Sequence, residues 1–260
     1  MVVYIEKELD AAMTDAVKSG DPMLLKSCQL AVVAGSAGSY SVEVEGEAEE
    51  VAFAELDRMV NDTSVTIERA RQIRLYLAWK GHLRSQFLEG ENFRMGRNTV
   101  QDYNIARYWY TKAAKRGHSG AQNNLGVMCA EGLGGPVDHK KAVYWYMKSV
   151  EAGDPTAKGN LGIHLVEGNG TKRNYLKAAR LLKESLKNNP YDARDHQLLA
   201  ECYEHGVAGR YGLRLALYHY QEASDFGSLK ARDALRRLSH MGMRSLAPAR
   251  AGARRTPRQK

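Results

Sequence analysis

The chain has 260 residues, of which 43% are hydrophobic and 26% are charged, and its formal net charge is +8. This length and composition are ordinary for a globular protein that buries a sizeable core. The longest apolar stretch, residues 30–35, is far shorter than the roughly 18 residues of a membrane-spanning helix. The first ten residues lack the basic and apolar regions of a secretory signal. We therefore expect no membrane span and a cytoplasmic location.

Charge is distributed unevenly along the chain. Residues 1–62 contain thirteen acidic and four basic side chains, so the rest of the chain is strongly basic. Such polarity can steer association with a partner of mixed charge, or it can serve solubility alone.

Residues 1–77 are interpreted as an acidic, helical N-terminal cap region. Patterns of apolar residues predict helices over residues 6–19 and 22–34, and further helices over 47–60 and 63–87. Residues 35–46 are predicted to be a loop or a short strand, because Tyr40, Val42 and Val44 alternate with other residues.

An internal repeat follows the cap region. The run Ala121-Gln-Asn-Asn-Leu-Gly126 recurs as Ala157-Lys-Gly-Asn-Leu-Gly162, an offset of 36 residues, and residues 106–117 match residues 142–153 at the same offset. Upstream, we align residues 83–90 with the first helix of the next copy, which makes the following loop about six residues longer. Downstream, a fourth copy matches at an offset of 38.

Each copy reads as a pair of helices. In the first helix Ala121, Leu125 and Cys129 share one face, and a glycine-rich turn follows. The second helix is predicted to bury Ala142, Trp145, Tyr146 and Ser149, and Trp109 and Tyr110 are predicted to be core residues of the preceding copy. A single pair cannot cover its own apolar face, whereas stacked pairs can.

These residues resemble Sel1-like repeats, which are relatives of tetratricopeptide repeats. Residues 121–153 fit the family pattern almost throughout, with Cys129 at the family tyrosine. Later copies depart from it at Leu181, Leu182 and His219. The resemblance covers residues 78–227 and implies an all-α fold, a right-handed α-solenoid of stacked antiparallel helix pairs. We expect about four repeats and a capping helix in residues 78–243.

Residues 244–260 contain six basic and no acidic side chains, and they are predicted to be a disordered tail. The tail is a possible contact for nucleic acid or anionic lipid. Cys28, Cys129 and Cys202 are far apart, so buried reduced thiols are favoured over a disulfide or a metal site. No nucleotide, zinc or nucleophile motif occurs, so we predict no cofactor, no metal and no enzymatic activity.

The resemblance places partner proteins on the concave side, which the first helices line. The predicted binding stripe there has one trio per copy, with His82, Gln86, Glu89, Asn124, Met128, Glu131, Asn160, His164, Glu167 and His205. A separate acidic cluster in the cap region, Glu47, Glu49 and Glu50, is predicted to dock a basic partner. Leu198 and Cys202 fill the fourth trio. A merely solvated face explains the same pattern.

The leading hypothesis is an adaptor or scaffold that binds another protein through this concave face. An immunity-type protein that neutralises one effector is an alternative, since the acidic region suits a cationic target. A regulator that contacts nucleic acid or membrane through the tail is a third.

Overall fold

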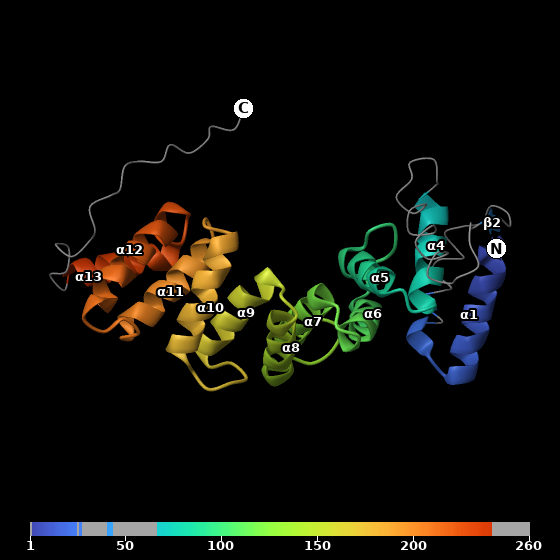
Figure 1. The fold of residues 1–260 in the computed structure, drawn as a ribbon, viewed down its shortest axis with the longest axis horizontal. Helices are drawn as coiled ribbons and strands as arrows, with labels where there is room; N and C mark the ends of the chain where they lie inside the picture. The colour runs from blue at the N-terminus through green and yellow to red at the C-terminus, as the bar shows by residue number, and fades with distance from the viewer. Residues whose placement is uncertain (1, 25, 28–40, 44–66, 241–260) are drawn as a thin grey trace, which may run out of the picture. The chain divides into compact units, whose positions relative to one another are not determined.

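The computed structural model describes residues 2–24, 26–27, 41–43 and 67–240, and the chain forms two compact units, Met1–Asp154 and Pro155–Lys260. The helices of the first unit are α1 (Ile5–Ser19), α4 (Ile67–Trp79), α5 (Leu83–Met95), α6 (Tyr103–Lys115), α7 (Ser119–Glu131) and α8 (His139–Glu151) (Figure 1). The second unit contains α9 (Pro155–Glu167), α10 (Tyr175–Asn188), α11 (Ala193–Glu204), the 3-10 helix η1 (Gly209–Tyr211), α12 (Gly212–Asp225) and α13 (Leu229–His240).

Two three-residue strands accompany the helices of the first unit. Strand β1 (Val2–Tyr4) pairs antiparallel with β2 (Ser41–Glu43), so that Val3 lies opposite Val42. The short strand predicted within residues 35–46 is therefore confirmed at 41–43. The helix predicted over 47–60, and all of 244–260, lie outside the described residues.

Helix ends recur with the period of the sequence repeat. Asp102, Asp138 and Asn174 begin α6, α8 and α10, and the side chain of each accepts hydrogen bonds from the first turn of its helix. The first helices end at glycines 36 residues apart, and both Gly96 and Gly132 adopt the left-handed conformation. Such caps satisfy backbone groups that a helix end leaves unpaired.

In three of the pairs, the two helices approach closely at a glycine. A Cβ added to Gly90, Gly126 or Gly162 would lie 2.5, 2.6 or 2.8 Å from a side chain of the second helix, namely Tyr110, Tyr146 or Leu182. These contacts repeat every 36 residues and lie inside the pairs α5–α6, α7–α8 and α9–α10. The glycine thus allows a large side chain to pack against the backbone of the first helix.

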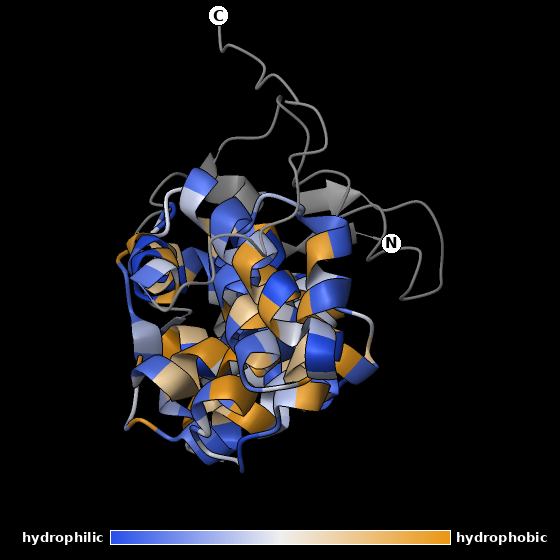
Figure 2. Cartoon of the chain, turned by 90° about the vertical axis from the view of Figure 1, so that its left-hand side faces the viewer, coloured by the Kyte–Doolittle hydropathy of each residue, from blue (hydrophilic) through white to orange (hydrophobic). Residues whose placement is uncertain are grey.

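Within each unit, consecutive helices from α4 to α8 and from α9 to α13 also pack on one another, so the pairs stack. Hydrophobic and hydrophilic residues alternate along the helices, as expected of helices with one buried side (Figure 2). Trp109, Tyr110 and Phe93 are fully buried in the first unit, and Leu199, Tyr203 and Tyr220 are buried in the second. The all-α class and the stacked helix pairs are as predicted.

The N-terminal region packs on α6 through polar contacts. Trp109 Nε1 donates a hydrogen bond to Ser27 Oγ at 3.1 Å, and the hydroxyl of Tyr108 donates to Asp21 at 2.6 Å. Lys26 Nζ pairs with Asp102 Oδ2 at 2.5 Å. Trp109 is fully buried, and its indole nitrogen is bonded to this region, in keeping with the predicted capping role.

Two sequence-based predictions about the start of the repeats are wrong. The helix predicted over residues 63–87 is broken after α4, because Gly81 has φ +97° and the chain turns there before α5. The alignment of copy one was also displaced by six residues. Helix α5 has the same length as α7 and ends 36 residues before it, so no longer loop follows it. The domain limits stay a prediction, and α4 runs across residues 77 and 78.

Candidate functional site

The predicted stripe on the first helices is accessible only in part. Glu131 and Glu167 are exposed at the ends of α7 and α9, and His205 is exposed just after α11. Asn124 and Asn160 are half-buried at matching positions of α7 and α9. Within each unit, these side chains are open to a partner.

The trio predicted for copy one is mostly buried, and the displaced alignment explains why. His82 occupies the N-cap position of α5, as His118 does in α7, so these two histidines correspond, although only the His118 side chain accepts a capping hydrogen bond. Gln86 therefore corresponds to Gln122: each donates a hydrogen bond to a carbonyl of the preceding helix, at 3.0 and 3.1 Å. These are packing positions.

Glu89 is buried for the same reason, because it occupies the position that Leu125 holds in the next copy. Burial raises the pKa of its carboxyl above the ordinary range, opposed by the nearby Arg74 and Arg71 and by a hydrogen bond from Asn92 at 3.2 Å. Glu89 is thus enclosed by the protein and is not presented to a partner.

Two further members of the stripe, in α7 and α9, are also buried. Met128 is inaccessible, and the ring of His164 lies beneath the following turn, with Nδ1 3.0 Å from Asn169 O. Leu198 and Cys202 in α11 are buried as well. The three acidic residues Glu47, Glu49 and Glu50 lie outside the described residues. The partner-binding role of the accessible members stays a prediction.

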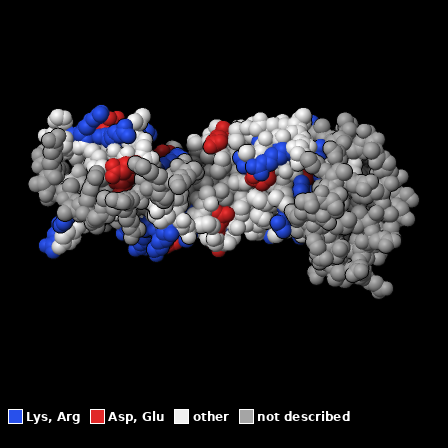
Figure 3. Space-filling view, turned by 90° about the horizontal axis from the view of Figure 1, so that it is seen from above, with Lys and Arg blue, Asp and Glu red and all other residues white. Residues whose placement is uncertain are grey.

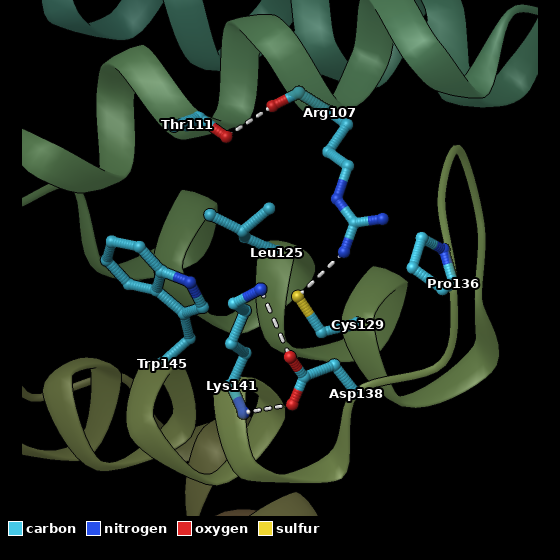
Figure 4. A pocket seen from close by; sticks show the side chains of 8 residues that line it. All are labelled: Arg107, Thr111, Leu125, Cys129, Pro136, Asp138, Lys141 and Trp145. Atoms are coloured by element: carbon cyan, nitrogen blue, oxygen red, sulfur yellow. Dashed lines mark hydrogen bonds and ion pairs between the residues drawn. The ribbon is translucent and has the colours of Figure 1, made fainter.

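A cleft of about 270 Å³ opens on the side of the second helices of the first unit. Leu125, Pro136 and Trp145 form apolar walls, and Arg107, Lys141 and Asp138 contribute charges (Figure 4). Trp145 is only half-buried, so the prediction that it is a core residue is wrong. One copy earlier, Trp109 is fully buried under Ser27, whereas Trp145 borders this open cleft.

Arg107 reaches from α6 across the cleft toward α7. Its Nη2 donates to Cys129 Sγ at 2.9 Å, and its Nη1 lies 3.4 Å from Leu133 O (Figure 4). Gly135 makes room for the guanidinium, because a Cβ there would collide with Nη1. Among the described residues, Arg107 has no carboxylate partner, so its positive charge is neutralised by no side chain that the structure describes.

Asp138 and Lys141 close the other side of the cleft. The carboxylate of Asp138 accepts a hydrogen bond from the backbone nitrogen of Lys141 at 3.0 Å and pairs with its Nζ at 3.1 Å. The backbone hydrogen bond and then the ammonium group lower the pKa of Asp138. The acid of the cleft is therefore already paired and does not compensate Arg107.

The second unit contains a coupled pair of histidines. His196 Nε2 lies 3.1 Å from Pro190 O, so this nitrogen carries the proton. His196 Nδ1 then accepts a hydrogen bond from His219 Nδ1 at 2.9 Å. Burial, with the nearby His196 and Lys183, lowers the pKa of His219 to about 3. The low pKa keeps the ring of His219 neutral near pH 7.

The two described cysteines are free and buried, as predicted: Cys129 lies in the cleft wall, and burial raises the pKa of Cys202 to about 12. Cys28 lies outside the described residues. In the part of the chain that the structure describes, no three His, Cys, Asp or Glu side chains are grouped so as to hold a metal ion. No described helix is long and apolar enough to cross a membrane.

The Sel1 repeat family model matches residues 84–118, 119–154, 155–190 and 196–227, more than half of the chain. The chain belongs to the Sel1 repeat family. The first three matches coincide with the helix pairs joined by the glycine contacts, and the fourth covers α11 and α12. A search of the curated proteins found no match.

Solved Sel1 structures share this fold. A Sel1 repeat protein from Oxalobacter formigenes is 27% identical, with a TM-score of 0.58 over 72% of this chain and 77% of that one. A protective antigen of uropathogenic Escherichia coli strains is 24% identical, with a TM-score of 0.51 over 75% of this chain and half of its own length. These likenesses confirm the right-handed α-solenoid. Sel1 repeat proteins generally mediate protein–protein interactions, and the fold is typically a non-enzymatic interaction scaffold.

Sequence reasoning missed Arg107, although the repeat contains a signal for it. At an offset of 36 residues, Arg107 corresponds to Val143, which is buried in α8. A charged residue where the next copy buries a hydrophobic one marks a position with a special role or a special environment. The positions that match between copies define the repeat, and Arg107 is not one of them.

Proposed function

We propose that this Sel1 repeat protein is an adaptor or scaffold that binds another protein through the concave face formed by the first helices of its repeats. The family relationship supports a protein partner in general. The accessible members of the predicted stripe support this particular face.

The observation that carries the proposal is the matched placement of Glu131 and Glu167. Each is the last residue of its first helix, each is exposed, and each precedes a glycine with positive φ. Glu131 forms no ion pair with any described residue, and Glu167 Oε2 accepts a hydrogen bond from Asn169 at 2.8 Å. Each unit therefore offers a carboxylate at the same position of its repeat.

His205 adds an exposed aromatic contact in the second unit. Its ring stacks on Tyr175, with ring centroids 4.3 Å apart. Stacking orders the imidazole at little further cost in conformational entropy, as suits a binding surface. Asn160, half-buried in α9 of the same unit, supplies an amide at the position of Asn124.

Affinity capture from a cell extract, read by mass spectrometry, tests this proposal. The double variant Glu131→Lys, Glu167→Lys should lose most of the partner that the unmodified chain recovers, because reversed charges repel a complementary surface. Glu151→Lys with Glu184→Lys is the matched control, since these exposed glutamates lie on the second helices α8 and α10.

Equal loss in the control would show a general charge effect and contradict the concave face as the binding surface. Unchanged recovery with both double variants would contradict it too. The inhibitor and the tail-dependent regulator depend on Glu47, Glu49 and Glu50 and on residues 244–260, which lie outside the described residues, so no structural observation favours either.

A further inference from the structure

We propose that a groove along α6 binds an acidic segment of a partner protein, with a carboxylate on Arg107 and an apolar side chain beside Trp145. The proposal depends on the proposed function in that the ligand belongs to a protein partner. It concerns a different surface, however. The groove is formed mainly by the second helices α6 and α8, with Leu125 and Cys129 of α7 in its wall, whereas the face proposed above includes Glu131 at the end of α7.

The groove, here called the Arg107 groove, comprises two clefts. The first is the cleft of about 270 Å³ beside Trp145, and the second has a volume of about 460 Å³ and is lined in part by Met23, Tyr108, Lys112 and Lys115. Arg107 and Thr111 line both clefts, so the guanidinium stands between them. A bound segment that contacts Arg107 can therefore extend into either cleft.

The guanidinium of Arg107 has no anionic acceptor among the described residues. The next copy has Val143, a buried apolar residue, at the matching position. The guanidinium instead donates to a thiol and a backbone carbonyl, which are uncharged acceptors. Carboxylates bind guanidinium groups more strongly, often through two parallel hydrogen bonds. An incoming carboxylate would supply the charge that Arg107 lacks.

The charges of the groove favour an anionic ligand. It has four cations, Arg107, Lys112, Lys115 and Lys141, and one acid, Asp138. Lys141 pairs with Asp138, and Lys112 Nζ lies 3.9 Å from a carboxylate oxygen of Asp21. Arg107 and Lys115 have no acidic partner among the described residues. Unpaired cations in a concave surface attract anionic segments and set the salt dependence of binding.

The shape of the first cleft favours a peptide over a polyanion. Leu125, Pro136 and Trp145 provide apolar walls that a phosphate backbone cannot cover, whereas a leucine or methionine side chain can. Lys and Arg side chains are exposed on both units, including the part of the second unit that holds α10–α13 (Figure 3), so exposed cations alone do not distinguish this groove. The ligand inferred for the Arg107 groove is therefore an acidic peptide with an apolar residue beside an Asp or Glu.

Fluorescence anisotropy with the full chain tests the inference. The probe is a short labelled peptide in which leucine is flanked by Glu and Asp, compared with the same peptide carrying Gln and Asn instead. The acidic peptide should bind more tightly. Arg107→Gln should weaken it about tenfold or more, as expected for loss of a charge-assisted hydrogen bond. Arg214→Gln, which removes an exposed charge from α12, should leave binding unchanged.

Several outcomes would overturn the inference. Equal binding by Arg107→Gln and by the unmodified chain would remove the groove as the site, provided that circular dichroism shows both folded. Equal Arg107-dependent binding of inorganic phosphate or single-stranded DNA would make it a general anion site. Binding of neither peptide would also reject it. Partner capture that depends on Glu131 and Glu167 but not on Arg107 would reject this inference while leaving the proposed function intact.

Discussion

The close contact between Gly126 and Tyr146 predicts that Gly126→Ala destabilises the pair α7–α8. The added Cβ would lie 2.6 Å from Tyr146 Cε1, 2.7 Å from Cδ1 and 3.1 Å from Cζ. Carbon atoms in favourable contact lie about 3.5–4.0 Å apart, so the helices must separate or the ring must move. Overpacking of this kind costs about 1–3 kcal/mol, whereas alanine gains about 1 kcal/mol over glycine in a helix. Because three ring atoms lie within 3.1 Å of the added Cβ, the overpacking cost should fall in the upper half of that range, about 2–3 kcal/mol, which leaves a net loss of about 1–2 kcal/mol.

Urea denaturation, followed by circular dichroism, measures the loss for the whole chain. Stacked repeats can unfold in parts, so hydrogen exchange of the α7 and α8 amides measures the loss locally. Gly120→Ala is the matched control in the same helix. Its Cβ would meet Phe87 at 3.3 Å and His118 at 3.4 Å, and both rings are half-buried, so they can move at little cost.

A double-mutant cycle separates the steric clash from other effects of the alanine. Tyr146→Val removes the ring atoms that the new Cβ would meet. In that background, Gly126→Ala should be neutral or stabilising, because only the gain in helix propensity is left. The reasoning is refuted if Gly126→Ala is as stable as the parent chain, or if it costs the same with valine at position 146.

Three further predictions concern the second unit. Burial lowers the pKa of His219 to about 3 in the folded chain, whereas its pKa is about 6.5 in the unfolded chain. Between these two pH values the unfolded chain therefore binds more protons than the folded chain. Stability should fall as pH falls below about 6.5, by at most about 2 kcal/mol at pH 5, and His219→Gln should flatten this dependence in urea melts. Arg237 pairs with Glu204 at 2.7 Å, so Arg237→Ala should lower the free energy of unfolding by about 0.5–1 kcal/mol and speed hydrogen exchange in α13. The control Arg236→Ala removes a mostly exposed ion pair and should change neither the stability nor the exchange rate. Asn174→Ala should cost about 1 kcal/mol by removing a cap, whereas Asn174→Asp should retain stability, and equal losses would refute the capping role.

The sequence was sufficient to predict the helix pairs because packing constrains them strongly. Gly126 and Tyr146 are two parts of one contact, and the contact recurs at Gly162 and Leu182 with the same spacing. Any substitution there must preserve the close approach of two helices, so the residue types stay recognisable from copy to copy. The match of residues 121–153 to the family pattern therefore located the repeat correctly.

The first copy was misaligned because glycine has two separate roles in this repeat. The sequence alignment matches Gly90 to the helix-ending Gly132, but Gly90 lies in the middle of α5, where Tyr110 packs against it. Gly96 is the helix-ending glycine. Sequence alone does not distinguish a glycine needed for close packing from one needed for positive φ. The error moved Gln86 and Glu89 from packing positions onto a supposed binding surface.

The site could not be predicted because identical residues have different neighbours in successive copies. Tyr108 and Trp109 of α6 bond to Asp21 and Ser27, and the matching Tyr144 and Trp145 of α8 are exposed and half-buried. The residues that recur with the repeat period are those that each helix pair requires in order to fold, and both copies contain them. Which side chains of a copy stay exposed depends on the segment that packs over that copy. Over α6 this segment is the N-terminal region with Asp21 and Ser27, which belongs to no repeat. Binding surfaces of this protein are therefore to be sought where a repeat position lacks the covering that its counterpart has, and Trp145, beside the unpaired Arg107, is such a position.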